Sequence, residues 1–214
     1  MKILLFLFLG ASLGSFLGLV IDRFPQQSII APASHCNHCK KQLKAWDLIP
    51  IVSQLSTHSK CRYCQAKIPY WYLLLEISSA FLVVLTAYQV LSFATSCVLL
   101  TGLVLGIYDI KHREYPLVVW LVLTFIALLF SSLNWLFFFF LALAYLAEKV
   151  NLKIGSGDLL YLATLALIFP YTNLLWLIQI SSILGLVTYF YFYRKALPFI
   201  PFLWLASIPV LLIF

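Results

Sequence analysis

Four cysteines in one polar stretch have the spacing of a metal site. They form two Cys-x-x-Cys pairs, Cys36 with Cys39 and Cys61 with Cys64, about twenty residues apart. Each pair presents two sulfurs from one tight turn, and four thiolates complete a tetrahedral zinc site. Such a site has no open position for substrate, so we expect a structural zinc ion. Free thiols and disulfides are the alternatives, and a reducing cytosol disfavours disulfides.

Two aspartates suggest a different chemistry, because each lies at the end of an apolar segment. Asp109 ends one such segment, and Asp158 begins another. Two carboxylates held close share a proton, so that one can activate a water molecule while the other polarises a scissile carbonyl. This is the chemistry of an aspartic protease. The alternatives are that Asp158 caps a helix and that Asp109 pairs with Lys111 or Arg113 at the membrane surface.

Two glycines precede the second aspartate in the segment Gly155-Ser156-Gly157. Glycine lets the backbone approach a substrate closely or turn into a helix, so we expect Gly155 and Gly157 to support the site around Asp158. The segment is not a phosphate-binding loop, because the Lys-Ser/Thr that completes such a loop is missing.

The composition is that of a membrane protein. The chain has 214 residues, of which 64% are hydrophobic and 10% charged, and its mean hydropathy is +1.02. Soluble domains are about half apolar and a quarter charged. The solvent around this chain must therefore be lipid. Cys97 lies alone in an apolar run, and we expect it to be a packing residue.

Apolar runs separated by short polar breaks predict an all-α polytopic membrane protein with about eight transmembrane helices. The expected spans are 3–21, 71–91, 94–110, 116–131, 133–147, 158–170, 172–193 and 198–214. Residues 1–21 are too long for the apolar part of a signal peptide and end in no cleavage site, which favours a retained first helix. Residues 22–70 form a small zinc-binding loop domain that needs a metal staple, and 71–214 form the transmembrane core.

Basic residues indicate the orientation of these helices. If residues 22–70 are cytosolic, the cytosolic breaks hold thirteen of the fourteen Lys and Arg residues. These are Arg23, Lys40, Lys41, Lys44, Lys60, Arg62, Lys67, Lys111, Arg113, Lys149, Lys153, Arg194 and Lys195. The positive-inside rule then places the N-terminus outside. Both aspartates lie on the cytosolic side, because two spans separate them.

The formal charge of +7 has the same explanation. It follows from topology and favours anionic lipid headgroups as the nearest partner, so we expect no nucleic acid. Arg23 ends the first span, and we expect it to reach the lipid headgroups.

Further motifs follow one another along the chain. They are Gly14 to Pro25, the two cysteine pairs with Asp47 to Ser53 between them, Glu76, Asp109 to Pro116, Gly155 to Asp158, and Pro198 to Leu203. In this order they resemble the motifs of the type IV prepilin peptidases, which are intramembrane aspartic proteases of the GxGD type. The resemblance extends over nearly the whole chain.

The resemblance implies an aspartic endopeptidase with Asp109 and Asp158 as its catalytic pair. Its substrates would be type IV pilin-like precursors, which lose a short basic leader at the cytosolic membrane face. Many members of the family also methylate the new N-terminus with S-adenosylmethionine. Leu160 and Gly18 stand where the family often has lysine and asparagine, and the resemblance links neither position to the hydrolytic carboxylates.

Glu76 lies about one turn inside the second span, and intramembrane glutamates are often functional. We expect it either to be a structural partner or to contact the substrate or the methyl donor.

Two other functions compete with the peptidase. One is an ion-coupled transporter, which would show repeats and broken helices at the membrane midplane. The other is a zinc-loop membrane protein that binds a partner and leaves the aspartates without a role.

Overall fold

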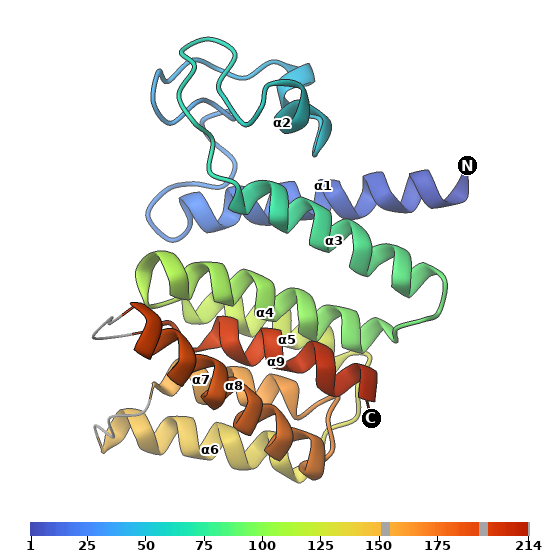
Figure 1. Ribbon diagram of the computed structural model, residues 1–214, viewed down its shortest axis with the longest axis vertical. Coiled ribbons are helices and arrows are strands. Elements are labelled where there is room, and N and C mark those ends of the chain that lie inside the picture. Colours follow the sequence, from blue (N-terminus) through green and yellow to red (C-terminus); the bar gives the residue numbers. More distant parts are fainter. Residues whose placement is uncertain (151–154, 193–196, 214) are drawn as a thin grey trace. The chain divides into compact units, whose positions relative to one another are not determined.

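The computed structural model describes residues 1–150, 155–192 and 197–213. Within them the chain is all-α, as predicted, and Figure 1 shows its helices. These are α1 (Lys2–Arg23), the 3-10 helix η1 (Ala45–Leu48), α2 (Val52–Ser56), α3 (Trp71–Ala87), α4 (Phe93–His112), α5 (Leu117–Leu128), α6 (Trp135–Lys149), α7 (Ser156–Leu165), α8 (Tyr171–Phe192) and α9 (Ile200–Ile213). The chain forms two compact units, Met1–Ser92 and Phe93–Phe214.

Several of these helices can cross a membrane. Among the described residues, Lys2–Arg23, Phe93–His112 and Tyr171–Tyr191 are long and apolar enough to do so, and Trp71–Ala87, Leu117–Leu128 and Ile200–Ile213 are shorter apolar helices. At about 1.5 Å per residue, the 12 residues of α5 give about 18 Å, against a hydrocarbon core of about 30 Å. The count of eight spans and their orientation therefore stay predictions.

A few residues used in those predictions lie outside the described part of the chain. They are the basic residues Lys153, Arg194 and Lys195 and the ends of two expected spans at residues 193 and 214.

In the first unit, a row of glycines brings α1 and α3 together. Gly10, Gly14 and Gly18 are spaced four residues apart on the buried face of α1. A Cβ atom added to Gly10 would lie 2.6 Å from the Cα of Ala80, and one added to Gly14 would lie 2.8 Å from the Cα of Glu76. Small residues at this spacing allow close backbone contact between membrane helices. Helix α3 therefore packs against α1 in this unit, and the predicted division of the chain at residues 21 and 70 stays a prediction.

Replacing Gly14 by valine should separate α1 from α3, because backbone atoms of α3 occupy the space that the side chain would need. Overpacking of this kind costs about 1–3 kcal/mol of stability or more. Thermal unfolding of the detergent-purified protein measures the loss. Ser12→Val is the matched control, since Ser12 is exposed on the same helix. An equal effect of both substitutions would contradict the role of the glycine row.

In the second unit, α4 is the most buried long helix, with buried side chains from Val98 to Tyr108. It packs against α5 and α9, while α6 packs against α7 and α8 against α9. Figure 1 shows that α4 and α6 end, and that α5, α7 and α9 begin, at the same end of this unit. This shared end brings together the motifs that hold the two aspartates.

Candidate active site

The four cysteines predicted to bind metal form one cluster. Their sulfur atoms all lie within 4.8 Å of one another, and the Sγ atoms of Cys36 and Cys64 are 3.8 Å apart. A tetrahedral zinc ion with Zn–S bonds of about 2.3 Å requires sulfurs about 3.8 Å apart. The donor set and its spacing therefore fit a structural Zn²⁺ with four thiolate ligands.

The two cysteine pairs lie in turns of the same geometry. The N–H of Lys40 donates to the carbonyl of Cys36, and the N–H of Gln65 donates to the carbonyl of Cys61, both at 2.9 Å. Lys40 and Gln65, each following a second cysteine, share a φ of 58°. Backbone bridges close the two turns, namely His35 with Gln42 and Lys60 with Lys67. Each turn thus directs two sulfurs toward one point.

The thiols influence one another's ionisation. Burial alone would raise the pKa of Cys36, but hydrogen bonds from the backbone of Cys39 and His38 and from neighbouring thiols lower it to about 6. A backbone hydrogen bond from Ala66 lowers the pKa of Cys64, but burial and the other three thiols outweigh it and raise the pKa to about 11. The four thiols titrate as a group, and binding of Zn²⁺ displaces their remaining protons.

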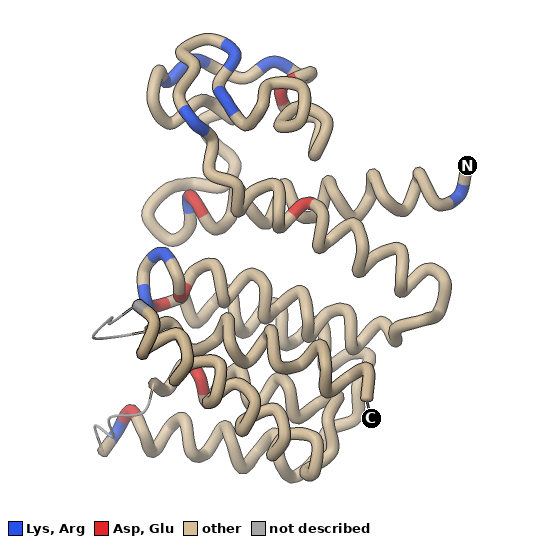
Figure 2. The backbone as a smooth tube through the Cα atoms, viewed as in Figure 1, with Lys and Arg blue, Asp and Glu red and all other residues tan. Residues whose placement is uncertain are grey.

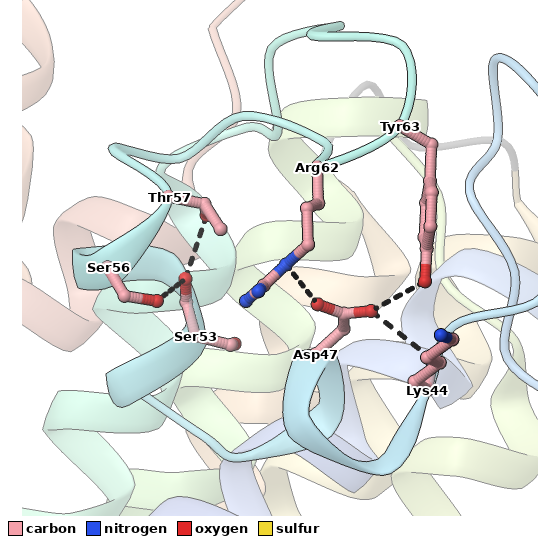
Figure 3. A network of polar contacts seen from close by, with 7 residues as sticks. All are labelled: Lys44, Asp47, Ser53, Ser56, Thr57, Arg62 and Tyr63. Carbon is pink, nitrogen blue, oxygen red and sulfur yellow. Dashed lines mark hydrogen bonds and ion pairs between the residues drawn. The ribbon is translucent and has the colours of Figure 1, made fainter.

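Asp47 joins the segment between the cysteine pairs to the second pair. As Figure 3 shows, its carboxylate pairs with the Nε of Arg62 at 3.0 Å and accepts a hydrogen bond from the hydroxyl of Tyr63 at 3.3 Å. It also accepts the backbone N–H of Lys44 at 3.3 Å, and the ammonium of Lys41 lies 4.2 Å from the Tyr63 ring centroid. Sequence reasoning gave Asp47 no role of its own, although it is an acidic residue in a basic loop.

Glu76 connects the segment between the two cysteine pairs to helices α1 and α3. Its side chain is buried and accepts the N–H of Ile51 at 2.7 Å and a hydrogen bond from Ser15. Ile51 has a φ of 62°, an uncommon conformation for a β-branched residue that needs support from its surroundings. Glu76 therefore has a structural role, and a contact with substrate or methyl donor stays a prediction.

Arg23 does not extend away from the protein toward headgroups, as expected from the sequence. It is buried, and its guanidinium donates to the carbonyl oxygens of Pro32 at 2.6 Å and Ala33 at 3.3 Å. Those carbonyls satisfy the charged group inside the protein. Arg23 thereby fixes the chain that leads from α1 to the first cysteine pair. Figure 2 shows other Lys and Arg residues of this unit gathered on the loop that follows.

In the second unit, Asp109 lies in the last turn of α4 and faces the start of α9. Its Oδ2 atom accepts the N–H of Ile200 at 3.2 Å, and the N–H of Phe199 also contributes. Because the N-terminus of a helix carries partial positive charge, this contact stabilises negative charge on Asp109. The motif from Pro198 to Leu203 thus begins α9 next to this carboxylate.

Asp158 lies in the first turn of α7, where its carboxylate folds back over Gly155. A Cβ atom at Gly155 would lie 2.7 Å from the Oδ2 atom of Asp158, and one at Gly157 would lie 2.9 Å from the ring of Tyr115. Neither glycine has a positive φ. The close approach of the Asp158 side chain to Gly155, and of the Tyr115 ring to Gly157, therefore explains why both positions are glycine. Helix α7 packs against α4, the helix of Asp109, and a hydrogen bond of 2.7 Å from Tyr115, in the turn after α4, to the carbonyl of Gly157 joins the two aspartate motifs.

A comparison with protein-family models matches residues 8–90 to the Bacterial Peptidase A24 N-terminal domain. The matched residues cover less than half of the chain and are similar to that domain. This match is consistent with the prepilin peptidase family that the motifs resemble. A search of curated proteins and a search of solved structures each found no match.

The matched residues include the four cysteines, Arg23, Asp47 and Glu76. Asp109 and Asp158 follow it in the chain. The domain match and the aspartates are thus independent observations, one from each compact unit.

Proposed function

We propose that the chain is an intramembrane aspartic endopeptidase that removes the leader peptide of type IV pilin-like precursors. Asp109 and Asp158 are its catalytic pair. The observation that carries the proposal is that two aspartates from different helices lie at one end of the second unit, where a hydrogen bond from Tyr115 to Gly157 joins their two motifs. The match to the A24 amino-terminal domain in the same chain supports it. The basic residues of the sequence favour the cytosolic membrane face as the place of cleavage.

The surroundings of the two aspartates suggest how they divide the work. Asp109 is the ionised member and acts as general base on a water molecule, because the N–H of Ile200 and the start of α9 stabilise its negative charge. Asp158 is the protonated member, which polarises the scissile carbonyl and later donates a proton to the leaving amine. A zinc ion held by Cys36, Cys39, Cys61 and Cys64 would have no open coordination position, so it would stabilise the fold of the loop and take no part in this reaction.

Co-expression tests the proposal. A pilin-like precursor is expressed with the wild type, Asp109→Ala or Asp158→Ala, and its mobility is followed on a gel. We expect processing only with the wild type, and N-terminal sequencing locates the cut. Normal processing by either variant would rule out the pair. Failure of the wild type on several precursors would favour the transporter instead.

Gly155→Ala should slow cleavage while leaving the fold intact, because the new methyl group displaces the Asp158 carboxylate. A displacement of about 1 Å in a catalytic group can cost about a hundredfold in rate. The rate of precursor cleavage by purified protein measures the effect. Ser156→Ala introduces the same residue between the two glycines, and we expect it to retain most of the activity. Equal rates for both variants would contradict the role given to Gly155.

Methyl transfer from S-adenosylmethionine is a second candidate function, which the family resemblance implies. One observation favours a small-molecule ligand in the first unit. A cavity of about 660 Å³ there has Glu76 and Gln54 in its wall. Gln54 is buried, and its Oε1 atom has no hydrogen-bond partner among the described residues. Mass spectrometry of the cleaved product decides the matter, since methylation replaces one hydrogen of the N-terminus by a methyl group and adds the mass of one CH2 unit.

A further inference from the structure

Tyr115 links the two aspartate motifs. It lies within the segment Asp109 to Pro116, where the residue types alone gave it no role. It lies in the turn between α4 and α5, six residues after Asp109. Its hydroxyl donates a hydrogen bond of 2.7 Å to the carbonyl of Gly157, the residue before Asp158. Burial raises the pKa of Tyr115, and the nearby Asp158 and Asp109 carboxylates raise it further. The phenol therefore remains a neutral hydrogen-bond donor close to both carboxylates.

Within the part of the chain that the structure describes, few other side-chain hydrogen bonds restrain the first turn of α7. Gly155 is its N-cap and makes no side-chain capping bond. Further along, α7 is joined to α5 by Trp120, whose Nε1 donates to the carbonyl of Leu160 at 3.1 Å. The hydroxyls of Thr124 and Thr164 lie 3.1 Å apart. These two contacts hold the middle of α7, and Tyr115 holds its start.

The geometry points to Tyr115 as a positioning residue for the proposed peptidase. By holding the Gly157 carbonyl, it fixes the first turn of α7 and so sets the place of Asp158 relative to Asp109. The inference rests on the proposed function. In this role the Tyr115 hydroxyl positions Asp158 through the backbone carbonyl of Gly157 and does not contact the substrate.

The close packing of Gly157 supports this arrangement. A Cβ atom there would lie 2.9 Å from the Tyr115 ring, so only glycine lets the phenol reach the carbonyl of the same residue. The turn that carries Tyr115 begins where α4 ends and is followed by Pro116, the N-cap of α5. One short segment thus connects the helix of Asp109 to the turn of Asp158.

Tyr115→Phe tests the inference, because it removes only the hydroxyl. We expect kcat for a precursor to fall about tenfold, since the geometry of the pair loosens. KM should stay within about twofold of the wild type, because substrate binding is unchanged. The unfolding temperature should stay within a few degrees, because most of the packing is unchanged. Thr124→Val is the matched control, as it removes one hydroxyl from the same pair of helices away from the aspartates. We expect it to keep the wild-type kcat.

A second variant checks that the hydrogen bond to Gly157 is the cause. Gly157→Ala should lower kcat as well, and Gly157→Ala with Tyr115→Phe should be no slower than the slower single variant, because both substitutions break one contact. A wild-type kcat in Tyr115→Phe, an equal loss in Thr124→Val, or additive effects in the double variant would each overturn the inference alone. Absence of cleavage by the wild type would overturn the proposed function together with it.

Discussion

Replacing Asp109 or Asp158 by asparagine should lower the rate of precursor cleavage about a thousandfold or more. Loss of a general acid or base typically costs a hundred- to ten-thousandfold. Asparagine has nearly the same size as aspartate, and its amide oxygen can still accept the N–H that Ile200 donates to Asp109. The fold should therefore survive while the proton transfer is lost. Initial rates with purified protein and a synthetic precursor measure the effect.

Glu114→Gln is the matched control for this prediction. It removes one negative charge from an exposed residue in the turn that follows Asp109, so any general effect of charge at this end of the second unit would appear there too. We expect its rate to stay near that of the wild type. If the glutamine variant were as slow as the asparagine variants, local charge rather than the pair would explain the loss.

Replacing Cys61 by serine should release the zinc ion and unfold the cysteine loop, residues 24–70. Cys61 is the buried member of the cluster, and structural zinc sites contribute about 10–16 kcal/mol of apparent binding energy at neutral pH. Without the ion, few contacts remain to order so short a polar segment. Elemental analysis should give about one zinc per chain in the wild type and none in the variant. Limited proteolysis should cut the variant between the two cysteine pairs.

Cys97→Ser is the control for the metal site, since Cys97 lies in α4 outside the cluster. It should keep the zinc and the protected loop. A metal-free wild type whose loop still resists proteolysis would contradict a structural zinc. We expect the loss of zinc to impair hydrolysis less than loss of either aspartate does, because the metal has no open coordination position.

The sequence sufficed to predict the features that depend on local spacing. The two Cys-x-x-Cys pairs fold into matching turns, since each needs only its own few residues to present two sulfurs. The apolar runs became helices close to their expected places, because burial in lipid allows few other backbone structures. Several helices are shorter than the apolar runs that predicted them. Pro170, for example, lies beyond the end of α7 at Leu165, although the apolar run continues to it.

The contacts that join distant segments could not be predicted in this way. Glu76 accepts a hydrogen bond from Ile51, and Arg23 donates to carbonyls in the loop after α1. Arg23 was expected to reach the lipid headgroups, and Glu76 was expected to be a structural partner or to contact the substrate or the methyl donor. Only the folded loop supplies the partners that the structure shows. Tyr115 is similar, because its hydrogen bond to Gly157 spans 42 residues and leaves no periodic signal in the sequence.

The central claim is that Asp109 and Asp158 act as one unit. The most direct test compares Asp109→Asn, Asp158→Asn and the double variant, purified with zinc and assayed on one precursor at saturating concentration. Residues that act together in catalysis have strongly non-additive effects, so we expect all three variants to share the same residual rate. A double variant slower than the singles by the product of their effects, or a single variant that keeps the wild-type rate, would contradict the pair.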